Sequence, residues 1–193
     1  MTLQKEDYPI RVQYDWEMGE FFPKEKMVQR KVSDLSMMFH DQDAVKAMVT
    51  GSDPLVYEIF YYGFKTSKSD MALGTTRIQP GKVGDEYHMT KGHFHEAEDQ
   101  PEIYFCVKGE GYLLMETRDG EFEAHEWTAG TISHIPPMWA HRVVNTGKEP
   151  LVFVASYHLS AGHDYGQIEA SGFLKRVVER DGKAVLVLNE ARK

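Results

Sequence analysis

Residues 92–109 read GHFHEAEDQPEIYFCVKG, and this stretch decides the fold. From position 102, successive side chains would point to opposite faces of a strand, so that Glu102 and Tyr104 lie on the same side. His93 and His95 are also two positions apart, and a strand would direct both imidazoles to one face. The stretch therefore indicates a β protein with polar side chains gathered on one face of the sheet.

Short apolar and β-branched runs, separated by Gly, Pro, Asn or Asp, continue along the rest of the chain. This rhythm is typical of antiparallel sheets rather than of βαβ units. We predict strands over residues 55–64, 72–78, 87–95, 103–107, 112–116, 122–127, 131–135, 141–145, 151–158 and 184–188. Helix is expected only at the flanks, where residues 33–39 begin with a capping serine and residues 173–179 suit a short turn or strand. Many short strands with tight turns predict an all-β closed barrel or jelly roll.

Composition excludes several classes of protein. The chain has 193 residues, a formal net charge of −8, nine histidines and one cysteine, Cys106, expected to be a buried small hydrophobe. This length favours a single domain over 1–193, with an N-terminal flanking extension over about 1–50. The negative net charge argues against nucleic-acid binding, which depends on contacts from Lys and Arg to the phosphates. Without an apolar signal core or a membrane-length apolar run, we expect a soluble, intracellular protein with no membrane partner.

Four residues carry side chains that bind transition metals. His93, His95 and Glu102 lie close together in the sequence, and His141 opens a later predicted strand. Three imidazoles and one carboxylate form a donor set that suits iron, nickel, manganese or zinc and leaves positions for water or substrate. We therefore predict a metal site made by His93, His95, Glu102 and His141.

The same residues resemble the two sequence signatures of the cupin superfamily. His93, His95, Glu102 and Gly109 match the first signature, and Gly130, Pro136, His141 and Asn145 match the second. Tyr87 and Met138 stand where the signatures have glycine, and the spacing from His95 to Glu102 is longer. The resemblance implies a cupin (jelly-roll) double-stranded β-helix barrel with short flanking helices.

Four segments narrow the resemblance to one family within the cupins. Residues 74–76 (GTT), 89–95 (MTKGHFH), 136–142 (PPMWAHR) and 161–166 (AGHDYG) resemble the cupin-type phosphoglucose isomerases. The resemblance implies a homodimeric, metal-dependent, cytoplasmic isomerase that interconverts D-glucose 6-phosphate and D-fructose 6-phosphate in glycolysis and gluconeogenesis. It would hold one divalent ion per subunit, with Fe²⁺ expected first and Ni²⁺, Mn²⁺ or Zn²⁺ as alternatives.

The resemblance also implies which residues bind the substrate phosphate. The hydroxyls of Thr76 and Thr90 and the backbone N–H of Gly92 would contact phosphate oxygens. Lys91 could add charge there, although regular strand alternation would place it on a different face from Thr90. A β-bulge at Gly92 would remove this objection.

Tyr157, His163 and Tyr165 match a polar group that borders the sugar in the family, and Tyr104 faces the same cavity because it shares a face with Glu102. We expect Glu102 to be the base that produces a cis-enediol, unless the hydrogen moves as a direct hydride shift and Glu102 is a ligand only. His163 or Tyr165 is the expected acid or base for opening the sugar ring.

Two other functions fit the same residues. One is a metal-dependent cupin dioxygenase, and the other is a non-enzymatic sugar- or metal-binding cupin. The remaining histidines match no signature position and are expected to be surface or structural residues: His40, His88, His125, His134 and His158.

Overall fold

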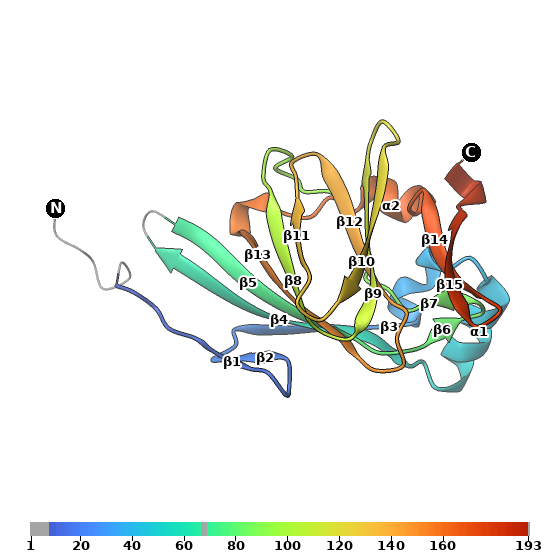
Figure 1. Ribbon diagram of the computed structural model, residues 1–193, viewed down its shortest axis with the longest axis horizontal. Helices are drawn as coiled ribbons and strands as arrows, with labels where there is room; N and C mark the ends of the chain where they lie inside the picture. The colour runs from blue at the N-terminus through green and yellow to red at the C-terminus, as the bar shows by residue number, and fades with distance from the viewer. Residues whose placement is uncertain (1–7, 67–68, 193) are drawn as a thin grey trace.

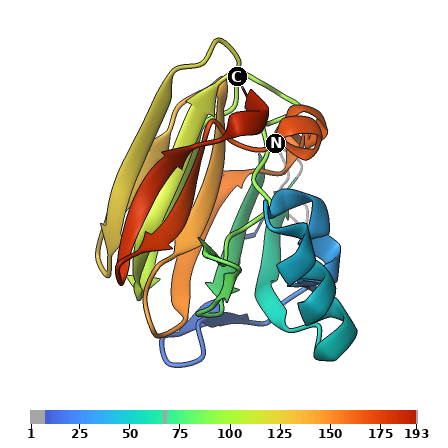
Figure 2. The same cartoon turned by 90° about the vertical axis from the view of Figure 1, so that its right-hand side faces the viewer.

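Two β-sheets face each other in the computed structural model, which describes residues 8–66 and 69–192 (Figure 1). The larger sheet runs, in spatial order, β11 (Ile132–Ile135), β8 (Glu102–Lys108), β13 (Leu151–His158), β5 (Ser69–Ile78), β4 (Leu55–Thr66) and β3 (Lys26–Lys31). The second has the order β10 (Phe122–Thr128), β9 (Glu110–Thr117) and β12 (Trp139–Asn145). Seen from the side, the two layers enclose the core (Figure 2).

Nested antiparallel pairs define the topology of the barrel. Strand β8 pairs with both β11 and β13, while β9, which follows β8 in the chain, pairs with both β10 and β12. Each successive two-stranded arm therefore crosses from one sheet to the other, which is the jelly-roll arrangement. The predicted all-β jelly-roll fold is confirmed.

Rings from both sheets fill the interior between the layers. Trp127 of β10 lies with its ring centroid 6.0 Å from Tyr104 of β8 and 5.5 Å from Phe153 of β13. Cys106 is fully buried, as expected of a small hydrophobe. Aromatic edge-to-face contacts of this kind add to the free energy gained from burying the rings.

Smaller elements surround the barrel. A further, four-stranded sheet at one end has the order β15 (Lys183–Leu188), β14 (Lys175–Arg180), β7 (Glu86–Tyr87) and β6 (Lys82–Val83), and a hairpin joins β1 (Gln13–Asp15) to β2 (Glu20–Phe22). The helices are η2 (Ser33–Met38), α1 (Gln42–Gly51), η3 (Leu159–Ala161), α2 (Gly166–Ser171) and η4 (Glu190–Arg192). No helix within the described ranges is long and apolar enough to cross a membrane.

Most predicted strands are confirmed, with boundaries that move by a few residues. Helix α1 was not predicted, although Asp41 gives it a conventional start by accepting a hydrogen bond from the N–H of Ala44 at 2.9 Å. The predicted helix over 33–39 is a 3₁₀ helix, and the ambiguous segment 173–179 is mostly strand β14. Residues 1–7 of the expected extension lie outside the described residues.

One strand prediction was wrong. Residues 87–95 do not form a continuous strand, because regular pairing ends with β7 at Tyr87. Isolated bridges then join Met89 to Val144 and His93 to His141. Five residues, 89–93, thus lie opposite four, 141–144, and the extra residue makes a β-bulge. Gly92 in this bulge has φ +76°, a conformation that other residues rarely adopt.

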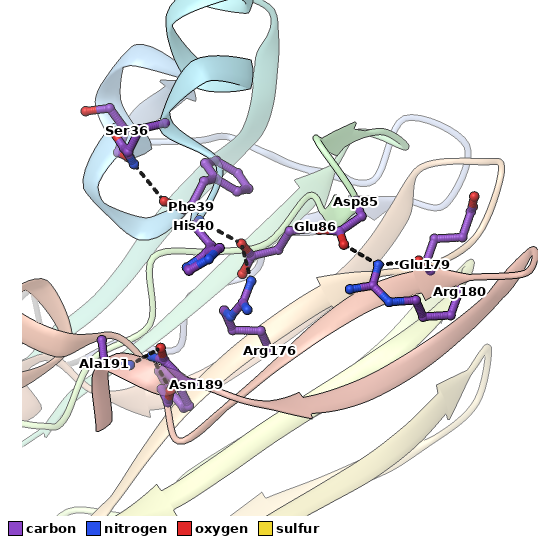
Figure 3. Close-up of polar contacts among 12 residues, drawn as sticks. Ser36, Phe39, His40, Asp85, Glu86, Arg176, Glu179, Arg180, Asn189 and Ala191 are labelled. Atoms are coloured by element: carbon purple, nitrogen blue, oxygen red, sulfur yellow. Dashed lines mark hydrogen bonds and ion pairs between the residues drawn. The ribbon is translucent and has the colours of Figure 1, made fainter. Parts of the chain in front are cut away.

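Polar contacts tie the N-terminal flank to the sheet at the end of the barrel (Figure 3). Glu86 of β7 is 1% exposed, and its Oε2 accepts a hydrogen bond from the backbone N–H of His40 at 3.0 Å. Nη1 of Arg176 on β14 lies 3.6 Å from the same oxygen. Burial raises the pKa of Glu86, while the His40 N–H and the Arg176 guanidinium act in the opposite direction. This cluster holds η2, β7 and β14 together.

A close approach of the backbones of β9 and β12 at Gly111 gives a test of the fold. A Cβ on Gly111 of β9 would lie 2.0 Å from the carbonyl oxygen of Val144 and 2.8 Å from Leu151 Cδ1. We expect Gly111→Ala to lower the free energy of unfolding by about 3 kcal/mol, because the paired backbone of β12 cannot retreat. Gly51→Ala is the matched control, since nothing lies within 4 Å of its added Cβ. Urea unfolding of both variants measures the difference, and equal midpoints would contradict this packing.

Candidate active site

Three histidines and one glutamate meet inside the barrel. His93 and His95 come from the segment after β7, Glu102 is the first residue of β8, and His141 lies on β12. One ligand atom from each of the four lies within 4.8 Å of all the others. The structure therefore brings together the four residues that the sequence predicted as metal ligands.

Backbone pairing places two of these imidazoles opposite each other. The N–H of His93 donates to the carbonyl of His141 at 3.3 Å, and the N–H of His141 donates to the carbonyl of His93 at 3.1 Å. Their ring centroids are 4.5 Å apart. The separation of these two side chains is thus fixed by strand register, not by side-chain packing alone.

The additional residues between His95 and Glu102 include one that contacts the cluster. Within the extra residues, the carbonyl of Gln100 lies 2.8 Å from Nδ1 of His95. This contact assigns the proton of His95 to Nδ1 and leaves Nε2, which is 3.2 Å from Oε2 of Glu102, to act as a ligand. The departure from the cupin spacing therefore does not disrupt the cluster.

Met138 is the other departure, and it keeps the backbone conformation for which the signature uses glycine. Its φ is +72°, and its N–H donates to the carbonyl of Glu98 at 2.9 Å. This contact ties the turn before β12 to the segment that follows His95. The entry into β12, and with it the position of His141, is therefore held despite the substitution.

The electrostatics of the cluster suit a cation. Burial lowers the pKa of His93 well below its usual value, and the neighbouring imidazoles lower it further. Burial alone would raise the pKa of Glu102, but His141 and His95 hold it below its usual value. Nε2 of His141 lies 3.1 Å from Oε2 of Glu102 yet has no well-aligned hydrogen-bond partner among the described residues. A neutral imidazole, a carboxylate and an unpartnered buried nitrogen are what a divalent metal ion requires.

A cavity opens from this cluster in three adjoining hollows. Two inner hollows of about 60 Å³ each share His93, Thr76 and His163 in their walls. A wider hollow of about 370 Å³ continues from His163 and Tyr165 toward β3. All eight residues predicted for the substrate side line the inner hollows: Thr76, Thr90, Lys91, Gly92, Tyr104, Tyr157, His163 and Tyr165.

The loop after η3 brings His163 and Tyr165 to the cluster. Backbone hydrogen bonds in both directions join Asp164 to Phe94, at 3.0 and 2.8 Å. The ring of His163 lies 4.4 Å from that of His93 and stacks with that of Tyr165 at 5.9 Å. Burial lowers the pKa of His163, which favours the neutral imidazole.

The bulge at Gly92 decides the position of Lys91. Its Nζ lies 4.1 Å from the centroid of the Tyr165 ring and forms an ion pair with Glu169 of α2. Lys91 therefore borders the cavity, as the sequence allowed only if a bulge was present. Part of its charge is already balanced by Glu169.

Strand β4 contributes side chains that the sequence analysis did not single out. Tyr57, Ile59 and Tyr61 alternate along the strand and line the cavity. Burial raises the pKa of Tyr57 to about 12 and that of Tyr61 above its usual value, so both hydroxyls stay protonated at neutral pH. Arg30 of β3 lines the outer hollow. Alternation within the predicted strand 55–64 was the available signal for the tyrosines.

Histidines without a signature position stay away from the cluster. His88 is 3% exposed and has Nδ1 3.1 Å from the carbonyl of Gln79, while His158 pairs with Asp70 at 2.7 Å. His125 contacts the hydroxyl of Ser133 at 3.0 Å. These are structural or surface contacts, as expected.

Comparisons with known proteins agree with this geometry. The model of the family described as Glucose-6-phosphate isomerase (GPI) matches residues 29–192. The chain belongs to the glucose-6-phosphate isomerase family. The glucose-6-phosphate isomerase of Thermococcus litoralis is 45% identical over 92% of this chain and 93% of its own length. That of Pyrococcus furiosus is 41% identical over 94% and 95%.

The comparison with solved structures extends over less of the chain. A structure of Bacillus subtilis oxalate decarboxylase aligns with 55% of this chain and 27% of its own, at 24% identity and a TM-score of 0.46.

The donor set makes metal binding testable without an activity assay. We expect purified protein to contain one divalent ion per chain and to unfold at a lower temperature after dialysis against a chelator, because bound metal stabilises only the folded state. Glu102→Gln keeps the side-chain shape but removes the charge, and should weaken metal affinity about 100-fold. His134→Ala, an exposed position on β11, is the control. Elemental analysis and thermal unfolding measure both effects, and wild-type metal content in Glu102→Gln would contradict this ligand set.

Proposed function

We propose that this protein interconverts D-glucose 6-phosphate and D-fructose 6-phosphate at a metal site formed by His93, His95, Glu102 and His141. Membership in the glucose-6-phosphate isomerase family supports the reaction. The observation that carries it is one cavity lined by both the ligand cluster and the segment 90–92. Such a cavity can hold the two ends of one sugar phosphate at once.

The ion we propose is a single divalent cation per subunit, Fe²⁺ first and Ni²⁺, Mn²⁺ or Zn²⁺ as alternatives. Imidazole and carboxylate ligands accept all four. When bound, it supplies Lewis-acid stabilisation of the negative charge that develops on a substrate oxygen. His93, His95, Glu102 and His141 would hold it.

Two threonines and one glycine suit the phosphate group. The hydroxyl oxygen of Thr90 already accepts a hydrogen bond from the N–H of Val143 at 3.1 Å, which leaves its O–H free to donate to a phosphate oxygen. Thr76, 4% exposed, and Gly92 line the same hollow. We propose that these three donors bind the phosphate, with the Lys91 ammonium adding positive charge at the edge.

Isomerisation moves one hydrogen between C1 and C2, and Glu102 is the carboxylate available to carry it as a proton. It is 5% exposed, so little water competes for the transferred proton. Removal of the C2 proton by Glu102, together with protonation of O1, would give a cis-enediol, and return of the proton to C1 with loss of the O2 proton would give the ketose. In the other route the hydrogen moves directly from C2 to C1 as a hydride while a proton is lost from O2 and gained at O1, and Glu102 transfers no proton between the carbons.

Ring opening precedes either route. The neutral imidazole of His163 can take a proton from the anomeric hydroxyl, and the hydroxyl of Tyr165, which stacks against it, can donate one to the ring oxygen. Tyr157 and Tyr104 line the hollow next to the ligand cluster. We propose that they border the sugar and hold its orientation.

We also propose that the chain is one domain over 1–193 and acts as a cytoplasmic homodimer. Apolar side chains of the N-terminal flank are exposed, with Trp16 at 66%, Phe22 at 50% and Met27 at 51%. Strand β3 is the edge of the larger sheet. Exposed apolar groups next to a sheet edge are typical of surfaces that bind another subunit.

Chelation gives the direct test of the proposed reaction. A coupled assay should detect glucose 6-phosphate formed from fructose 6-phosphate, and the activity should disappear with a chelator and return with added divalent metal. Glu102→Gln should lower kcat/KM by about 1000-fold or more, because it removes a ligand and the proposed base. His134→Ala should retain the activity of the wild type. Oxygen uptake with a small organic substrate, without sugar phosphate turnover, would instead support a dioxygenase.

Deuterated water separates the two routes. If Glu102 carries the hydrogen as a proton, part of the product should contain deuterium at C1 or C2, because a carboxylic acid exchanges with solvent. Mass spectrometry of sugar phosphate recovered after partial conversion measures this label. Deuterium in the product would contradict a hydride shift, whereas product free of deuterium even after many cycles of reversible conversion would count against Glu102 as a base that exchanges with solvent.

A further inference from the structure

Arg142 is a buried charge that the proposed reaction does not yet use. It follows His141 on β12 and is 2% exposed. Strand alternation directs its side chain to the face opposite His141, toward Phe173 and Met38. The guanidinium carbon lies 4.6 Å from the centroid of the Phe173 ring, and Nη2 lies 3.5 Å from the sulfur of Met38.

Both hydrogen bonds from this guanidinium to the main chain end on one carbonyl. Nε and Nη2 of Arg142 donate to the carbonyl oxygen of Lys91, at 3.2 and 2.6 Å. Lys91 lies in the bulge, where the regular pairing of residues 89–93 with β12 is interrupted. The arginine thus supplies the partner that strand pairing does not supply to this carbonyl.

The direction of this carbonyl determines the direction of the next N–H. The Lys91–Gly92 peptide bond is trans, so its C=O and N–H groups point to opposite sides. With the carbonyl held toward Arg142, the N–H of Gly92 is turned away from the arginine. Gly92 lines the cavity, and its N–H has no hydrogen-bond partner in the part of the chain that the structure describes.

We propose that Arg142 is a positioning residue that holds the Lys91–Gly92 peptide so that the Gly92 N–H faces the substrate phosphate. The inference rests on the proposed function and deepens it, because it identifies what orients one of the three phosphate donors. The guanidinium also places a positive charge behind the peptide. Its attraction for the carbonyl oxygen polarises the peptide and strengthens the N–H as a donor to an anion.

Local packing explains why a glycine at position 92 and an arginine at position 142 are needed together. A Cβ on Gly92 would lie 2.6 Å from the Phe173 ring and 3.1 Å from Cβ of Arg142, so only glycine fits the bulge. Two N–H groups of a planar guanidinium can reach one oxygen while its face lies against an aromatic ring. A lysine ammonium would keep the charge but not this arrangement.

Kinetic constants and metal content of Arg142 variants separate a positioning effect from a general loss of structure. In Arg142→Met, which keeps an apolar stem against Phe173, we expect KM for fructose 6-phosphate and the inhibition constant of inorganic phosphate to rise about tenfold. We expect kcat to fall less than KM rises, and metal content to stay that of the wild type. Arg142→Lys should lie between Arg142→Met and the wild type.

Arg176→Met is the matched control for losing a largely buried arginine. The Arg176 side chain is 13% exposed and pairs with Glu86, not with the carbonyl of Lys91. This variant should lose stability while its inhibition constant for phosphate stays unchanged. A general effect of removing a buried charge would weaken phosphate binding in both arginine variants.

Nuclear magnetic resonance observes the N–H directly and needs no turnover. The chain contains two Lys–Gly pairs, 91–92 and 108–109, so ¹³C-carbonyl lysine with ¹⁵N-glycine labels only the amides of Gly92 and Gly109. In the Zn²⁺-loaded wild-type protein, inorganic phosphate should move the Gly92 signal downfield and leave that of Gly109 in place. In Arg142→Met and Arg142→Lys, the movement of the Gly92 signal should be reduced.

The outcomes distinguish this inference from the proposed function. If the wild type isomerises fructose 6-phosphate but its Gly92 signal does not respond to phosphate, the inference is overturned and the proposed function stands. Wild-type phosphate inhibition in both Arg142 variants also overturns it. Should Arg142→Met fail to fold, the lysine variant and the wild-type titration decide. A wild type without isomerase activity overturns the proposed function, whether or not Gly92 responds.

Discussion

The pairing of residues 88–93 with β12 is the interaction on which the site depends. Its regular part sets His93 opposite His141, and its bulge at Gly92 turns the preceding peptide toward Arg142. Two members of the ligand cluster and two of the three proposed phosphate donors therefore come from one backbone arrangement. A change in register would move both at once, because every side chain along the segment would change its face.

The fold and the ligand cluster followed from the sequence for a simple physical reason. Strand alternation and motif spacing are local properties, and they were enough to predict β8, β9 and β12, to place Glu102 and His141 at strands, and to identify His93 and His95 as their partners. Helix α1 could also have been found from Asp41 and the residues after it. Strand β3 could not, because its sequence, KMVQRK, carries no apolar alternation and only pairing with β4 makes it a strand.

The other features that sequence reasoning missed depend on contacts between distant residues. The break in the predicted strand 87–95 arises because the segment meets β12 with one residue too many, which no local pattern reveals. The contact of Arg142 joins positions 51 residues apart, and its acceptor is a backbone carbonyl, which has no residue type to recognise. Tyr57 and Tyr61 lay on a predicted strand, yet only the folded barrel shows that their face borders the cavity.

The bulge also bears on which sugars can react. His93 and the proposed phosphate donors Thr90 and Gly92 lie within four consecutive residues, so the span between metal and phosphate is set by a short piece of backbone and not by flexible side chains. Under the proposed function, a substrate would have to match a nearly fixed distance between its phosphate and the carbons that exchange hydrogen. Hexose and pentose phosphates differ in that distance, so we expect the cavity to select by carbon chain length.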